Sequence, residues 1–131
     1  MLVSVSNGFV DIFENWLYWY QLLALDMRVV LMAEDKEVYD KYVSNREFLT
    51  RAGRFEDIVT QGAHEYESPA YKNLVSNRPA YLLEIFQSYS KIIYTDIDTV
   101  WLEDPRPFFT GNYDMWISLD EEHIVPQRNA E

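Results

Sequence analysis

The chain has 131 residues, 48% of them hydrophobic and 16% aromatic, which is enough for one folded domain with its own core. A formal net charge of −11 argues against a nucleic-acid partner, because binding to phosphate backbones depends on clustered Lys and Arg side chains. There is no cysteine, which excludes disulfides and thiolate metal sites, and no apolar run approaches the roughly 18 residues of a membrane-spanning helix.

The first 44 residues alternate between short apolar runs and helical patterns. Residues 2–5 form a short strand candidate that ends at a turn-forming Ser-Asn-Gly sequence. Aromatic and aliphatic side chains then recur every three or four residues over 9–24, which predicts an amphipathic helix. The apolar run 28–33 is typical of a strand buried on both faces, and the polar stretch 36–44 is typical of a second helix. Because parallel strands need crossover helices, this order predicts an α/β fold.

The second half of the chain is less regular. Residues 45–67 are charged and polar, with only 57–60 as a possible strand. Ser68 followed by proline predicts the start of a helix, and Pro79 is expected to split or kink that helix because proline lacks the donor that a continuing helix needs. The remaining predicted elements are a strand at 92–95, a turn or short helix at 105–109 and a strand at 115–119.

Two carboxylates one residue apart, Asp96 and Asp98, end the apolar run at 92–95. In an extended segment both would point to one side while Ile97 points to the other. Such a pair suits Mg²⁺ or Mn²⁺, which prefer oxygen ligands, and is less suited to acid–base catalysis because it lacks a separately tuned partner. On spacing alone, a solvated strand end explains the two acids about equally well.

The segment from Arg78 to Phe108 resembles the signature of the nucleotide-diphospho-sugar transferase family, and in particular the plant rhamnogalacturonan xylosyltransferases of glycosyltransferase family 77. An arginine precedes a leucine-rich helix, an Ile-Ile-Tyr strand, the Asp-x-Asp pair and a Trp-Leu-x-Asp-Pro tail, in the sequence RPAYLLEIFQSYSKIIYTDIDTVWLEDP. The Ser-Asn-Gly turn, the NWL of the first helix and the VLMAED run are similar to the opening of that family. The resemblance covers most of residues 2–120 and is weakest over 45–67.

This resemblance implies a GT-A-like fold, with a mixed, mainly parallel sheet flanked by helices, and a metal-dependent glycosyltransferase. The donor that it implies is a UDP-sugar, and the acceptor is a glycan or glycoprotein. It also implies that the reaction retains the anomeric configuration and uses Mn²⁺ or Mg²⁺ as cofactor. The location that it implies is the Golgi lumen. By resemblance, Asp98 ligates the metal and Asp96 contacts the metal's shell and the ribose. Ser6 and Asn7, after the first strand, lie against the nucleotide.

Three further residues have both a functional and a structural interpretation. Arg78 is predicted to hold a diphosphate oxygen or to orient Asp96, and is otherwise a surface arginine at a helix start. Asp35, at a strand end, is predicted to take ribose hydroxyls, or about equally well to cap the next helix. Asp120 matches an acid placed near the donor sugar, although a strand-end turn is the favoured account. No residue is assigned as the catalytic group.

The chain is roughly half the length of a complete GT-A domain, so residues 1–131 are expected to form one such domain truncated at its C-terminus. The rival hypothesis is an acidic α/β binding module with solvated carboxylates and no catalysis. A phosphotransferase or nucleotidyltransferase using the same acids is a further alternative, but the chain has only four glycines and no glycine-rich phosphate loop.

Overall fold

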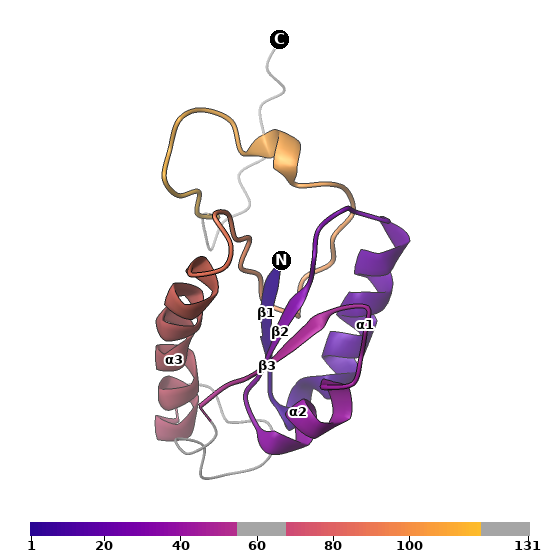
Figure 1. The fold of residues 1–131 in the computed structure, drawn as a ribbon, viewed down its shortest axis with the longest axis vertical. Coiled ribbons are helices and arrows are strands. Elements are labelled where there is room, and N and C mark those ends of the chain that lie inside the picture. Colours follow the sequence, from indigo (N-terminus) through magenta and orange to yellow (C-terminus); the bar gives the residue numbers. More distant parts are fainter. Residues whose placement is uncertain (55–67, 119–131) are drawn as a thin grey trace.

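The structure, a computed structural model, describes residues 1–54 and 68–118. Its centre is a parallel sheet in the order β1 (Leu2–Val5), β2 (Val30–Ala33) and β3 (Leu49–Ala52), shown in Figure 1. The three strands end level with one another, because Val5 pairs with Ala33 and Ala33 pairs with Ala52. The predicted α/β class and the two predicted apolar strands are therefore confirmed.

Helices cover both faces of the sheet. Helices α1 (Val10–Leu22) and α2 (Lys36–Tyr42) lie on one side, and α3 (Pro69–Phe86) lies on the other (Figure 1). Two separate apolar cores result, because alternate residues of each strand point to opposite faces. The core under α1 and α2 contains Phe13, Trp16 and Leu31, whereas the core under α3 contains Leu2, Val30, Met32, Tyr81 and Ile85.

The predicted strand at 92–95 is reduced to a single parallel bridge between Tyr94 and Leu2. The amide of Leu2 donates to the carbonyl of Ile93 at 2.8 Å, and the amide of Thr95 donates to the carbonyl of Leu2 at 3.1 Å. The Tyr94 segment therefore lies beside β1, on the side opposite β2. Along the sheet the order becomes β3, β2, β1 and then this segment.

Three sequence predictions differ from the structure. Strand β3 was not predicted, because it is half exposed and its backbone pairing with β2, rather than an apolar pattern, defines it. Helix α3 is not split at Pro79, since the proline is exposed and the buried Tyr81 and Ile85 anchor the following turns to the sheet. Residues 115–118 form no strand and are exposed, because no described strand pairs with them.

Several other predictions are confirmed. Ser68 caps α3 by accepting a hydrogen bond from the amide of Tyr71, and a 3-10 helix, η3 (Arg106–Phe108), lies within the predicted turn at 105–109. A second 3-10 helix, η1 (Asn7–Phe9), leads into α1. The possible strand at 57–60 lies outside the described residues. Over the ranges 1–54 and 68–118, no helix has the length and apolar character to cross a bilayer.

A buried polar contact ties α3 to the sheet. Glu34, directly after β2, is 1% exposed, and its carboxylate accepts a hydrogen bond of 2.7 Å from the Tyr81 hydroxyl. The same hydroxyl accepts a bond of 3.2 Å from the amide of Arg54, just after β3. Burial raises the pKa of Glu34 to about 7, although the Tyr81 hydrogen bond partly opposes that rise. Tyr81 thereby joins the ends of β2 and β3 to the middle of α3.

The close approach at this junction predicts that Gly53→Ala destabilises the fold. An added Cβ would lie 2.6 Å from the carbonyl oxygen of Ala33 and 2.8 Å from the Tyr81 hydroxyl oxygen, so backbone must shift. We expect a loss of about 1–3 kcal/mol in the free energy of unfolding, measured by urea denaturation. Gly8→Ala, at an exposed glycine, is the control. Equal stabilities of the two variants would contradict the prediction.

The buried carboxylate predicts that stability falls as pH rises. Unfolded Glu34 loses its proton near its ordinary value of 4.5, whereas the folded protein keeps it to about 7. Between these two pH values the folded state binds more protons than the unfolded state, so the free energy of unfolding falls as the pH rises. The total loss over this range is roughly 3 kcal/mol. Glu34→Gln keeps an acceptor for Tyr81 and removes this loss.

The measurement is urea unfolding of both proteins at pH 4.5 and at pH 8. We expect Glu34→Gln to gain stability relative to the unaltered chain on going to pH 8, whereas Glu103→Gln, at an exposed side chain, gains none. A difference between Glu34→Gln and the unaltered chain that is the same at both pH values would rule out a raised pKa at Glu34.

Candidate functional site

Those sequence-predicted site residues that the structure describes lie around the point where the strand order reverses. From β1 the chain proceeds to β2 and β3 on one side, and later returns as the Tyr94 segment on the other. In open α/β sheets, ligands bind at the carboxyl ends of strands next to such a reversal. Ser6 and Asn7 follow β1, and Asp96 and Asp98 follow the Tyr94 segment.

The Asp-x-Asp pair lies on a turn, which corrects the extended geometry that the sequence predicts. Ile97 and Asp98 form the turn, and the Thr99 hydroxyl closes it by donating to the carbonyl of Asp96 at 2.8 Å. The Thr95 hydroxyl lies 3.2 Å from that of Thr99 and also donates to the carbonyl of Asp96. Two threonine side chains therefore fix the backbone between the acids.

The turn separates apolar from acidic side chains as the sequence predicts. Ile97 packs against the core under α1 and α2, while Asp96 and Asp98 are exposed. Within the described ranges, the Asp98 carboxylate has no hydrogen bond or ion pair. Its oxygens are therefore free to bind a cation or water.

Arg78 extends from α3 to Asp96. Its Nη1 atom lies 3.2 Å from Oδ1 of Asp96, and its guanidinium lies over the ring of Tyr94 at 5.8 Å from the ring centre. The arginine side chain is 27% exposed, whereas that of Asp96 is 53% exposed. Tyr94 also donates a long hydrogen bond of 3.4 Å to the same Asp96 oxygen. The structure thus brings Arg78 and Asp96 together, while a contact of Arg78 with a diphosphate stays a prediction.

Asp35 joins the end of β1 to the start of α2. Its Oδ1 accepts from the amide of Val38 at 2.9 Å as the N-cap of α2, and its Oδ2 accepts from the amide of Asn7 at 2.6 Å. The side-chain amide of Asn7 in turn donates to Glu37. The capping interpretation of Asp35 is therefore confirmed, and a role for it in ribose binding stays a prediction.

Ser6 lies next to this contact and has a free polar group. It is buried, and within the described residues its hydroxyl has no hydrogen-bond partner. A buried hydroxyl without a partner is uncommon, so it is available to a ligand at the strand end. Asp120, the remaining predicted site residue, lies outside the described residues.

Glu34 and Tyr81 are the residues near the site that the sequence reasoning did not single out. The burial of Glu34 could have been predicted from the sequence, because residues two apart on a strand point to the same face. Val30, Met32 and Glu34 therefore point together toward α3, and a carboxylate that continues such an apolar series is buried. Arg78 and Tyr81, three residues apart on α3, are on adjacent turns of one helix face.

The available oxygen ligands fit a divalent cation only in part. Asp96 uses Oδ1 for Arg78 and Tyr94, and among the described residues neither its Oδ2 nor the Asp98 carboxylate has a protein partner. Within residues 1–54 and 68–118, no group of three or more His, Cys, Asp or Glu side chains is arranged to hold a metal. Two carboxylates with substrate phosphates and water are, however, a usual ligand set for Mg²⁺.

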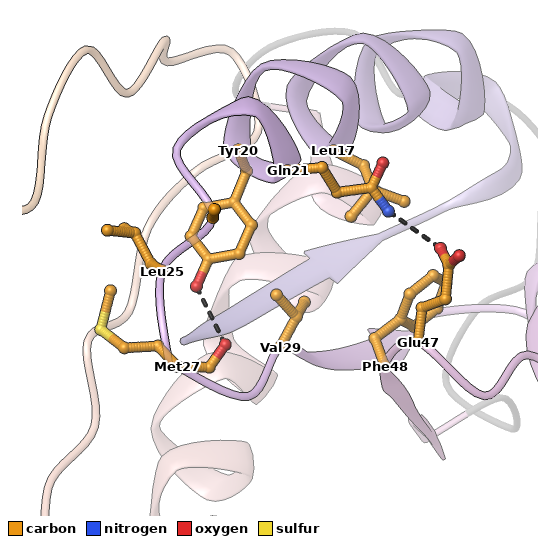
Figure 2. Close-up of a pocket in the computed structure, with 9 residues that line it drawn as sticks. Leu17, Tyr20, Gln21, Leu25, Met27, Val29, Glu47 and Phe48 are labelled. Atoms are coloured by element: carbon orange, nitrogen blue, oxygen red, sulfur yellow. Dashed lines mark hydrogen bonds between the residues drawn. The ribbon is translucent and has the colours of Figure 1, made fainter.

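A cavity of about 230 Å³ lies at the opposite end of the sheet (Figure 2). Val29 and Phe48, which directly precede β2 and β3, line it together with residues of α1 and the following loop. The Tyr20 hydroxyl donates to the carbonyl of Met27 at 3.0 Å, and Gln21 donates to Glu47 at 2.9 Å (Figure 2). Because the cavity is at the amino ends of the strands, it is separate from the acidic turn.

Comparison with curated proteins shows that this chain is similar to plant xylosyltransferases. UDP-D-xylose:L-fucose alpha-1,3-D-xylosyltransferase 3 of Arabidopsis thaliana is 30% identical, over 99% of this chain and 34% of its own length. UDP-D-xylose:L-fucose alpha-1,3-D-xylosyltransferase MGP4 of the same plant is 28% identical, over 96% of this chain and 35% of its own length. The chain thus spans about a third of the length of these curated relatives. No solved structure gives a significant match.

A sequence model of a whole family extends this result. The model described as nucleotide-diphospho-sugar transferase matches residues 24–131, which include Arg78, the acidic turn and all of α2 and α3. The match covers well over half of the chain, and the parallel α/β sheet agrees with part of a GT-A-like fold. This chain is therefore a member of the nucleotide-diphospho-sugar transferase family.

Proposed function

We propose that this chain binds the nucleotide-diphosphate donor of a metal-dependent sugar transfer, with a UDP-sugar as donor and a glycan or glycoprotein as acceptor. The observation that carries the proposal is the Arg78–Asp96 pair beside the free carboxylate of Asp98, at the reversal of strand order. The relatives' names specify UDP-D-xylose and L-fucose, so UDP-xylose is the first donor to test. Retention and a Golgi location belong to the proposal through family resemblance alone.

The chain's own residues would divide the work of donor binding. Asp98 and Oδ2 of Asp96 would hold Mn²⁺ or Mg²⁺, which when bound neutralises charge that develops on a departing diphosphate. Arg78 would donate to a diphosphate oxygen from the α3 side. Thr95 and Thr99 would keep the acidic turn in place, because they fix its backbone before any ligand arrives.

Ser6 would contribute from the end of β1. Its buried hydroxyl has no partner among the described residues and can donate to, or accept from, the nucleotide. Asn7 would lie against the nucleotide with its backbone already engaged, because its N–H donates to Asp35 and its carbonyl accepts from the amide of Val10, while its side-chain amide donates to Glu37. Asp35 would then support the nucleotide site by holding Asn7.

The second candidate function is an acidic α/β binding module without catalysis. It is favoured by the lack of a third metal-ligating side chain within the described ranges and by the exposure of both acids. The binding module and the sugar transferase differ in the nucleotide affinity that they predict. A binding module with solvated carboxylates has no metal-dependent affinity for a nucleotide, and it tolerates Asp98→Asn without loss of any binding.

Binding of UDP is predicted to require both the metal and Asp98. We expect calorimetric titration of UDP into the chain with Mn²⁺ to give a measurable dissociation constant, which EDTA abolishes. Asp98→Asn keeps the size of the side chain but removes its charge, so we expect UDP binding at least about tenfold weaker. Asp114→Asn, at another exposed aspartate, is the matched control and should bind as the unaltered chain does.

Two results would contradict the proposal. Equal weakening by Asp98→Asn and Asp114→Asn would mean that only general charge matters. Absence of any metal-dependent binding, in a chain whose circular dichroism shows the folded α/β domain, would favour the binding module instead. ATP, compared with UDP under the same conditions, distinguishes a nucleotidyltransferase from a sugar transferase.

A further inference from the structure

Glu34 is a buried acid that the proposed donor site does not use directly. It is 1% exposed and directly follows β2, on the face of the sheet that α3 covers. An ionised carboxylate removed from water is costly unless other polar groups surround it. Its neighbours should therefore reveal what offsets that cost.

Polar groups from several parts of the fold surround Glu34. Tyr81 of α3 donates to Oε2 at 2.7 Å, and the Ser4 side chain of β1 and the Arg78 guanidinium each favour the charged form. Asp35, the next residue, opposes it. Two further groups contact these neighbours. Tyr94, beside β1, interacts with the Ser4 side chain, and the amide of Arg54, after β3, donates to the Tyr81 hydroxyl. Arg78 is the one cation of this group whose side chain favours ionised Glu34.

Arg78 pairs with one acid and favours the charged form of a second, Glu34. Its Nη1 contacts Asp96 at 3.2 Å, while its Nε is buried and has no hydrogen-bond partner among the described residues. Arg78 also precedes Tyr81 by three residues on the same helix, so the Glu34–Tyr81 bond fixes the turn of α3 that carries Arg78. Glu34 is therefore linked to Arg78 in two ways, by the attraction between their charges and by the Tyr81 hydrogen bond to the same helix.

We propose that Glu34 is a positioning residue, which holds the Arg78 guanidinium at Asp96 through its charge and its bond to Tyr81, and so prepares Arg78 for the donor diphosphate. This proposal rests on the proposed function for its last step only. The ordering of Arg78 is a property of the protein without ligand. Its effect on donor affinity is a separate quantity.

The positioning role makes Arg78 sensitive to pH. The pKa of Glu34 is about 7, because burial disfavours its charge. Below that pH the neutral acid attracts Arg78 less, and above it the carboxylate attracts it fully. The Tyr81 hydrogen bond lowers the pKa of Glu34, so Tyr81→Phe should move the same transition to higher pH.

The first readout is the Arg78 Nε–H signal by ¹⁵N NMR, recorded without ligand from pH 5.5 to 8.5. In the unaltered chain we expect its shift and its protection from solvent exchange to change with a midpoint near 7. Glu34→Gln keeps an acceptor for Tyr81 but removes the charge, and should abolish the transition. Glu103→Gln is the control with the same chemical change at an exposed site.

The second readout is the dissociation constant of UDP-xylose with Mn²⁺ at pH 6 and pH 8. A UDP-sugar is preferable to UDP here, because the terminal phosphate of UDP itself titrates near pH 6. We expect Glu34→Gln to weaken binding about fivefold at pH 8 and hardly at all at pH 6. A purely structural role would weaken binding equally at both pH values.

The outcomes separate this proposal from the proposed function. An Arg78 signal that is unchanged in Glu34→Gln would overturn the positioning role. A changed signal with unchanged donor affinity would overturn the last step, the preparation of Arg78 for the diphosphate. If Glu34→Gln does not fold, Tyr81→Phe provides the test. An upward shift in the pH midpoint of its Arg78 signal would support the proposal, and no shift would contradict it. Failure of the unaltered chain to bind UDP-xylose would overturn the proposed function, while the Arg78 signal still decides whether Glu34 positions the guanidinium.

Discussion

The backbone pairing of Leu2 determines where the acidic turn can lie. Its amide and carbonyl both bond the segment after α3, which attaches that segment to the edge of β1 that β2 does not occupy. Leu2 is itself buried under α3, so the pairing is protected from water. Because the Tyr94 segment lies on this edge, the strand order reverses at β1. The same placement brings Asp96 within reach of Arg78 on α3.

Much of this arrangement could be predicted from apolar patterns, and the parts that could not depend on contacts between distant residues. Short apolar runs identified β1 and β2, the three-to-four-residue spacing of apolar side chains identified α1, and a polar stretch after β2 identified α2. Strand β3 leaves a weak pattern because it is half exposed, and α3 continues through Pro79 because its buried residues hold it. The turn at Asp98 depends on threonine hydroxyls whose partners no spacing reveals.

The acids near the strand ends look alike in sequence but differ in their surroundings. Asp35 has its oxygens occupied by two backbone amides, so it acts as a cap. Glu34 is buried and its pKa is raised to about 7, so it is a titratable group near neutral pH. Asp96 shares one oxygen with Arg78, whereas Asp98 has no partner within the described ranges. The proposed metal binding would therefore depend mainly on Asp98, and the apolar pattern alone does not separate this acid from its neighbours.

Charge explains why a donor at this turn would need a cation. Asp96 and Asp98 carry two negative charges, and the diphosphate of a UDP-sugar adds about two more, against the single positive charge of Arg78. With Arg78 already paired to Asp96, the remaining repulsion must be offset by an ion. A divalent cation held by Asp98 would supply that positive charge next to the carboxylate. The negative charge of the turn, unfavourable for a nucleotide alone, would thus become favourable for a nucleotide and a metal together.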